Sequence, residues 1–260
     1  MNAARTVISS RQYLAQPRDA TSEFLEQELF TANAFASTTN FANPTPYEGF
    51  ALGSTQPTGI FVEFLKLLQM ITSLERQAVA NTALLQNSGI DPSGLRKLFE
   101  QARSRTMSIG GEFKSTNEQE YLHLTRTANC FYHAGLIYSH RALLKADPTS
   151  AERDMQFTTS KFELFRCLEF HVSSKATMQD LVWPLFIAGT EATHPDERAM
   201  VVTKLKEAMA GTGFSNCQRA LDFLVALWNK RDLEALKESE FDWIAFAREW
   251  TGEGRTFLVF

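Results

Sequence analysis

Two pairs of arginine and histidine residues have a spacing that could act on a phosphodiester bond. Arg126 precedes His133 with six residues between them, and Arg166 precedes His171 with four residues between them. An arginine can bind a phosphate in a bidentate manner while a neutral histidine accepts or donates a proton. A chain with five histidines provides about one such spacing by chance, so the pattern alone assigns no catalytic residue.

This spacing is similar to that of helical HEPN-type ribonucleases, and ribonuclease activity is therefore kept as an alternative function. The sequence contains no G-x-S-x-G, no P-loop and no G-x-G-x-x-G that follows a predicted strand. These patterns would indicate the common hydrolase, nucleotide-binding and dinucleotide-binding classes. We therefore expect a protein that is not an enzyme.

The sequence does not predict a metal site. Glu191-x-x-His194 has the spacing of a di-iron ligand pair, but such a site needs a second pair and two further carboxylates, and Pro195 follows directly. His133 and His140 lie seven positions apart on one helical face, and we interpret them as partly buried and hydrogen-bonded. No cofactor and no metal are assigned to this chain.

The spacing of the cysteines also predicts no metal site. Cys130, Cys167 and Cys217 are far apart in the sequence and form no C-x-x-C pair. This spacing argues against a disulfide framework and against a structural zinc site, and it fits a reducing intracellular compartment.

The composition predicts a folded protein without a membrane segment. The chain has 260 residues, of which 44% are hydrophobic, and its 26 basic and 30 acidic side chains give a net charge of −4. This length suits one domain with a sizeable core, and no run approaches the ~18 apolar residues of a membrane helix. The acidic balance and the lack of a Lys/Arg cluster exclude an autonomous nucleic-acid binder.

The elements that position these residues are predicted to be helices. Glycine and proline are scarce, with 13 and 8 residues, and apolar residues recur at intervals of three and four. We predict an all-α fold, an irregular multi-helix bundle forming a single domain over residues 21–260, preceded by a flexible tail over residues 1–20. The tail has arginines and serines and almost no acid, so a mitochondrial transit peptide is its alternative interpretation.

Capping residues and helix breakers predict some of the helix boundaries. Ser115-x-x-Glu118 is a capping box that would open the longest helix, and Thr193 would cap a later one. Residues 108–116, with two adjacent glycines, are expected to form a loop. Pro184 cannot donate a backbone hydrogen bond, so the helix that contains it must kink or restart there.

A series of motifs occupies the C-terminal half of the chain. They are Trp183-Pro184-Leu185-Phe186-Ile187-Ala188-Gly189-Thr190-Glu191-Ala192, Arg198, Asn216, Leu224-x-x-x-Trp228-x-x-Arg231-Asp232 and Asp242-Trp243. Upstream lie Ala134-Gly135-Leu136-Ile137-Tyr138-x-x-Arg141-x-Leu143-Leu144 and Gly53-Ser54. Over roughly residues 50–250 this series resembles the fungal-specific transcription factor regulatory domain, the helical domain found downstream of six-cysteine binuclear zinc clusters.

The motif residues are interpreted as mainly architectural. Trp183 and Trp228 are expected to anchor the core, and the alternative is that they line an aromatic effector pocket. Gly189 would permit close approach of two helices. Arg198 would pair with Glu191, which lies one to two turns away in the sequence.

The resemblance implies a regulatory module of a zinc-cluster-type transcriptional regulator that does not itself bind DNA. It implies nuclear localisation, with the cytoplasm as the alternative, and zinc only where a cluster lies upstream. The implied partners are a second copy or a related regulator, a small-molecule effector, and DNA only indirectly. A helical protein-interaction scaffold without an effector is the rival hypothesis, besides the ribonuclease.

Overall fold

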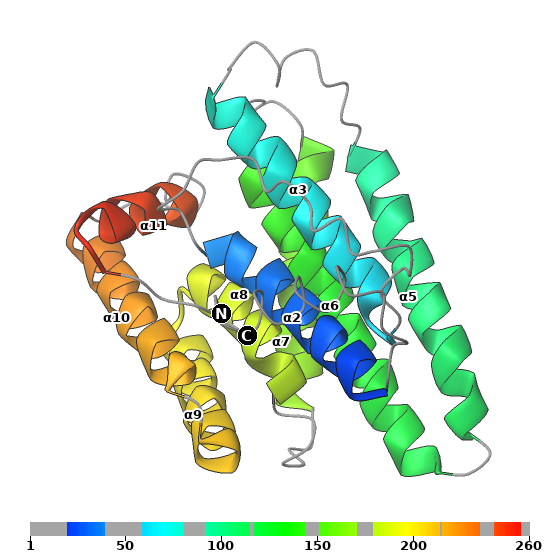
Figure 1. The fold of residues 1–260 in the computed structure, drawn as a ribbon. Coiled ribbons are helices and arrows are strands. Elements are labelled where there is room, and N and C mark those ends of the chain that lie inside the picture. Colours follow the sequence, from blue (N-terminus) through cyan, green and yellow to red (C-terminus); the bar gives the residue numbers. More distant parts are fainter. Residues whose placement is uncertain are drawn as a thin grey trace, which may run out of the picture.

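The computed structural model describes residues 20–39, 59–80, 92–114, 117–143, 151–170, 179–213, 215–234 and 242–255. Within these ranges all regular secondary structure is helical, as the sequence predicts (Figure 1). The helices are α2 (Ala20–Thr39), α3 (Val62–Ala80), α5 (Pro92–Lys114), α6 (Glu118–Leu143), α7 (Ala151–Glu169), the 3-10 turn η1 (Gln179–Leu181), α8 (Val182–Glu191), α9 (Pro195–Thr212), α10 (Asn216–Glu234) and α11 (Trp243–Gly252). The predicted N-terminal tail lies almost entirely outside the described residues.

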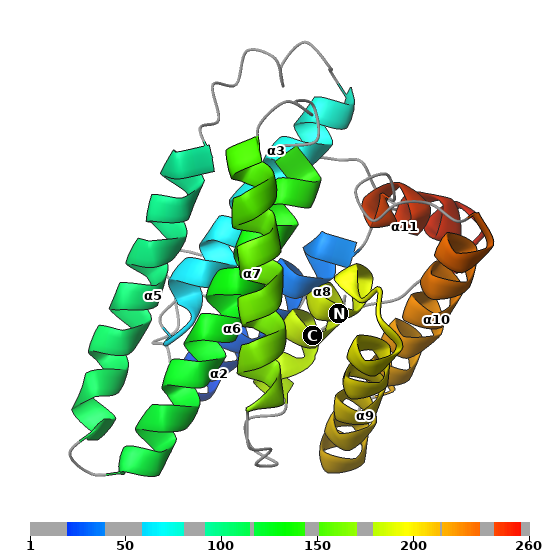
Figure 2. The same ribbon diagram turned by 180° about the vertical axis from the view of Figure 1, so that it is seen from behind.

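Helix α6 forms the centre of the larger part of the fold. It packs against α3, α5, α7 and α8, and α2 packs on α3. Figures 1 and 2 show α2 and α7 on opposite faces of this group, while α9, α10 and α11 extend to one side. Helix α8 contacts α6 and α7 as well as α9 and α10, so it joins the two parts.

An aromatic cluster joins α2, α6 and α8 in the core. The ring centroid of Trp183 lies 6.0 Å from that of Phe35 and 6.0 Å from that of Phe131. The indole Nε1 donates a hydrogen bond of 3.0 Å to Thr38 Oγ1, which satisfies the one polar group of the side chain. Trp183 is 1% exposed and lines neither of the two cavities described below.

Helix α8 is buried along its whole length. Glu191 is its one charged residue, so nearly every face of the helix can contact an apolar neighbour. The helix begins anew at Val182 after η1, and Pro184 therefore lies in the first turn, where backbone N–H groups have no intrahelical acceptor. The interruption predicted at Pro184 is thus a restart of the helix.

Helix α5 continues through most of the segment that the sequence predicts as a loop, and ends at Lys114. The prediction is wrong because Gly110 serves the packing of two helices and does not break α5. A Cβ atom on Gly110 would lie 1.9 Å from Cδ2 of Leu124 on α6, whereas a Cβ atom on Gly111 would meet nothing within 4 Å. Gly110 therefore permits α5 and α6 to approach closely without ending the helix.

Two N-caps differ from the sequence prediction. Asn117 Oδ1 accepts a hydrogen bond of 3.2 Å from the backbone amide three residues later, so Asn117 takes the capping position of α6 expected for Ser115, which lies outside the described residues. The N-cap of α9 is His194 instead of Thr193. The backbone N–H of His194 donates to the Glu197 carboxylate at 3.1 Å, which is one half of a capping box.

Candidate functional site

Motif residues of the C-terminal half converge on the last turn of α8. Trp228 Nε1 donates to the carbonyl oxygen of Gly189 at 2.9 Å, and Arg231 donates to those of Thr190 and Ala192 at 2.5 and 3.0 Å. Carbonyl groups at the end of a helix lack intrahelical donors and carry partial negative charge. An indole N–H and a guanidinium from α10 supply donors there, and they hold α10 against α8.

Glu191 forms a buried ion pair with Arg141 of α6, and the predicted pair with Arg198 is wrong. Arg141 Nε and Nη2 lie 2.9 and 2.6 Å from the two Glu191 carboxylate oxygens, and the side chains are 8% and 1% exposed. The chain turns between α8 and α9, which directs Arg198 toward α10. There its guanidinium binds both Asp232 carboxylate oxygens, at 2.7 and 2.8 Å, and lies over the Trp228 ring.

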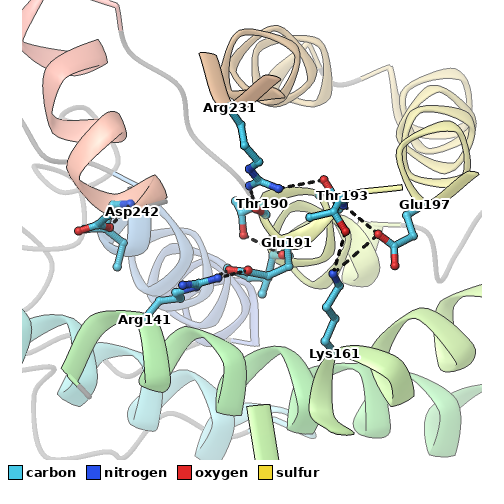
Figure 3. A network of polar contacts seen from close by, with 12 residues as sticks. Arg141, Lys161, Thr190, Glu191, Thr193, Glu197, Arg231 and Asp242 are labelled. Atoms are coloured by element: carbon cyan, nitrogen blue, oxygen red, sulfur yellow. Dashed lines mark hydrogen bonds and ion pairs between the residues drawn. The ribbon is translucent and has the colours of Figure 1, made fainter. Parts of the chain in front are cut away.

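A lysine of α7 adds a third cation at the end of α8 (Figure 3). Lys161 Nζ lies 3.3 Å from Thr193 Oγ1 and 3.8 Å from a Glu197 carboxylate oxygen. Arg141, Lys161 and Arg231 come from α6, α7 and α10, so three helices contribute a positive charge to the junction of α8 and α9. A helix C-terminus favours such cations.

The other motif residues lie at helix starts or in the core. Asp242 caps α11, because its Oδ1 accepts from the backbone N–H groups of Ile244 and Ala245 at 2.9 and 3.1 Å. Trp243 is 1% exposed, and Asn216 is partly buried at the first position of α10. Gly189 contacts α10 closely, as the sequence predicts, because a Cβ atom there would lie 2.5 Å from a Leu224 methyl group.

A cavity of about 320 Å³ lies between α5, α6 and α7. Its wall combines aliphatic and aromatic side chains with hydroxyl groups, two histidines and one arginine. The lining residues are Leu95, Arg96, Tyr132, His133, Leu136, Ser139, His140, Met155, Gln156, Phe157, Thr159 and Ser160. A mostly apolar cavity of this size with a few convergent polar groups is the usual form of a small-molecule site.

His133 and His140 reach this cavity from one face of α6, as their spacing predicts. Burial lowers the pKa of His133 to about 4, although Glu163 acts to raise it. The imidazole is therefore neutral near pH 7. Its Nδ1 atom is buried and has no hydrogen-bond partner among the described residues, so the predicted hydrogen bond is not made by this nitrogen.

The residue pairs of the ribonuclease hypothesis are not assembled at this cavity. Arg126 lies about two turns before His133 on α6 and is not a lining residue. Arg166 lies on the surface of α7, where its Nε and Nη2 bind Glu163 at 2.9 and 2.6 Å. His171 lies outside the described residues.

Phe157 connects the cavity to the last turn of α8. Its ring centroid lies 4.7 Å from that of His140 in the cavity wall, and the Arg141 guanidinium carbon lies 4.7 Å from the same centroid. Because Arg141 binds Glu191, a single aromatic ring lies between the cavity and the buried ion pair. The Phe157 ring therefore contacts both the cavity wall and the guanidinium of the buried ion pair.

Two cysteines that are distant in sequence meet between α6 and α7. The thiols of Cys130 and Cys167 are hydrogen-bonded to each other, and both residues are free cysteines. This hydrogen bond lowers the pKa of the partly exposed Cys167 and raises that of the buried Cys130.

Neither a metal centre nor a membrane segment is found in the part of the chain that the structure describes. No group of three or more His, Cys, Asp or Glu side chains there could hold a metal ion. Glu191 is bound by Arg141, and His194 is exposed at the start of α9. Among the described helices, none combines the length and apolar character needed to cross a bilayer.

Comparison with known proteins gives the family. The fungal specific transcription factor domain matches the chain over residues 1–260. The chain belongs to this family. No curated protein and no solved structure gives a significant match. The family assignment confirms the resemblance carried by the motif series and extends it beyond residues 50–250.

Two features of this fungal-specific transcription factor domain were not predicted from its motifs. Arg141 belongs to the upstream motif, but its buried partner across 50 residues could not be inferred from spacing. The cavity lies outside the C-terminal motifs, and its wall comes from three helices. The seven-residue spacing of His133 and His140 was the one feature of the sequence that indicated residues of this cavity.

Proposed function

We propose that this domain is an effector-responsive regulatory module of a fungal zinc-cluster-type transcriptional regulator that acts in the nucleus. The observation that supports an effector is the cavity between α5, α6 and α7, which holds polar groups in a mostly apolar wall. Its wall residue Phe157 contacts Arg141, and Arg141 is the partner of Glu191 at the end of α8.

The proposed mechanism is a shift between two packings of α8. A ligand changes an equilibrium only when it binds one state more tightly than the other. Ligand in the cavity would fix the position of Phe157 and hence of the Arg141–Glu191 pair. Since α8 contacts α6, α7, α9 and α10, a change at this pair alters how the C-terminal helices are held.

We further propose that these residues do not read DNA directly. The net charge of −4 supports this, because nucleic-acid binders need a concentration of basic side chains. DNA would be reached through a zinc cluster elsewhere in the same regulator or through a related partner. Purified protein should give no sequence-specific, salt-resistant shift of DNA in a gel, and such a shift would contradict this part of the proposal.

Thermal unfolding with a metabolite panel tests the effector. A ligand that binds only the folded state raises the melting temperature, and the stabilisation grows with the logarithm of its concentration over Kd. Thr159→Trp places an indole at the cavity wall, and Thr158→Trp, at the adjacent exposed position outside the lining, is its matched control. A stabilising compound should lose its effect on Thr159→Trp alone. A panel without any stabilising compound would favour the scaffold hypothesis.

Dimerisation is the second candidate function, and the outer face of α7 favours it. Met155 and Phe162, seven positions apart on α7, are both 65% exposed, and Phe170 just beyond the helix is 62% exposed. Large apolar side chains in a row on a surface often mark a protein–protein contact. Phe162→Asp should then abolish a dimer seen in sedimentation, whereas a monomeric wild type would remove this candidate.

A further inference from the structure

We infer that the occupant of the α5–α6–α7 cavity is a small organic acid, with an apolar ring and one carboxylate. This inference rests on the proposed function, because it assigns the chemical class of the effector. The observations that support it are the charges of the lining, a buried imidazole nitrogen of His133 without a hydrogen-bond partner among the described residues, and the apolar side chains and volume of the cavity.

The lining carries positive charge and no acidic side chain. Arg96 is its one ionic residue, and it has no ion-pair partner among the described residues. The other arginines of the same helix differ, because Arg103 binds Glu100 at 2.5 Å and Arg105 binds Glu63 at 3.1 Å. A guanidinium beside an apolar cavity that has no ion-pair partner in the described part of the chain suits a carboxylate, which it can bind through two parallel hydrogen bonds.

His133 offers a second polar contact inside the cavity. A neutral imidazole carries one N–H, and with that proton on Nδ1 the buried nitrogen can donate to a carboxylate oxygen. The Ser139 and Thr159 hydroxyl groups already donate to the backbone carbonyl oxygens of Gly135 and Met155, at 2.5 and 2.7 Å. His133 is therefore a lining group whose unmet hydrogen bond a ligand can satisfy.

The remainder of the wall suits an apolar ring. Leu95 and Leu136 line the cavity together with the rings of Tyr132 and Phe157. The volume of about 320 Å³ lies toward the lower end of the range for small-molecule sites, so one ring with a short acid chain is the expected size. Aromatic rings favour such a partner by stacking or by edge contacts.

A second cavity, of about 370 Å³ between α2, α3 and η1, has the opposite charge. Glu28 and Asp180 are its charged lining residues. An acid should be repelled there, whereas an amine should be attracted. The two cavities should therefore prefer ligands of opposite charge, so acids and amines can be compared in the same protein.

Calorimetric titration of the full chain tests the inference. The probes are benzoate, phenylacetate and 3-phenylpropanoate, each compared with its neutral amide and with the amine of matched length. We expect at least one acid to bind, its amide to bind more weakly, and Arg96→Gln to weaken the acid about tenfold or more. Lys97→Gln removes the same charge from the next, exposed position of α5, outside the lining, and should change affinity less than twofold.

The other outcomes separate this inference from the proposed function. If an amide binds as tightly as its acid and Arg96→Gln has no effect, the acid class is wrong although the cavity remains a ligand site. If an acid binds equally well to Thr159→Trp, the ligand lies elsewhere and this inference fails, while the metabolite panel still tests the proposed function. If none of the acids binds at millimolar concentration, the inference is overturned, and the metabolite panel alone decides the proposed function.

Discussion

The Arg141 guanidinium binds the Glu191 carboxylate through two hydrogen bonds, 2.9 and 2.6 Å long, in a nearly solvent-free contact between α6 and α8. Two buried charges lose their hydration, so each depends on the other for compensation. The pair therefore makes the position of α8 sensitive to anything that moves Arg141. Phe157, which lies over the guanidinium, belongs to the wall of the cavity.

Removal of one partner of this ion pair should destabilise the domain strongly. We expect Arg141→Met to lower the free energy of unfolding by about 3–5 kcal/mol, because Glu191 is left as an uncompensated buried charge. The double variant Arg141→Met with Glu191→Leu should recover most of this loss. Urea denaturation followed by circular dichroism measures both values.

The control for that experiment is an exposed ion pair. Arg166 Nε and Nη2 bind one carboxylate oxygen of Glu163 on the surface of α7, and Arg166→Met should cost less than about 1 kcal/mol. Equal losses for Arg141→Met and Arg166→Met would contradict the importance of burial at the first pair.

Two adjacent glycines of α5 should respond to alanine in opposite directions. Gly110→Ala is expected to cost about 1–3 kcal/mol, because its Cβ atom would overlap the Leu124 side chain. Gly111→Ala should stabilise by about 0.5–1 kcal/mol, since alanine favours a helix interior and nothing lies nearby. Equal effects in urea denaturation would mean that α5 does not pack on α6 in this way.

Acidification should destabilise the fold through His133. Its pKa is about 4 in the folded protein against 6.5 for an ordinary histidine, so between these pH values the unfolded chain binds a proton that the folded chain does not. Stability is therefore lost as pH falls from 6.5 to 4, by on the order of 3 kcal/mol. Glu163 and Glu100 oppose the shift, while Arg103 and Arg166 add to it.

His133→Gln isolates this contribution, because it keeps a polar side chain without the titration. The difference in unfolding free energy between wild type and variant should change by that amount from pH 7 to pH 4. A difference that stays constant with pH would show that His133 titrates normally.

Among the cysteines, Cys167 should react fastest with iodoacetamide. The thiolate is the reactive form, and the hydrogen bond from Cys130 lowers the pKa of Cys167, which is also partly exposed. Burial keeps Cys130 and Cys217 inaccessible and raises the pKa of Cys217. Mass spectrometry after brief labelling at pH 7 should find the adduct at Cys167 first, and Cys130→Ser should slow that reaction.

Local sequence patterns predicted the helices better than the contacts between residues of different helices. Trp228 of α10 is predicted from the motif series to anchor the core, and its side chain is buried together with that of Leu224. A loop was predicted at the two adjacent glycines of α5, because glycine is typical both of a helix end and of a close contact between two helices. The partner of Glu191 was also misread, since a pairing between residues 50 positions apart depends on how α6 and α8 are docked.

The residues that line the cavity also could not be predicted from local sequence patterns. Its residues come from α5, α6 and α7, so no single segment carries its pattern. Sequence spacing could place His133 beside His140, because one helix holds both. It could not place Arg96 and Phe157 opposite them, because their positions follow from helix packing.

The hydrogen bonds at the end of α8 also have a consequence for biosynthesis. Its terminal carbonyl groups receive donors from Trp228 and Arg231, which follow them by 39 to 41 positions. On the ribosome, the centre of the domain therefore cannot reach its final form until α10 has been translated. A premature stop codon between α9 and α10 should yield a substrate for chaperones and proteases, and not a shortened regulator.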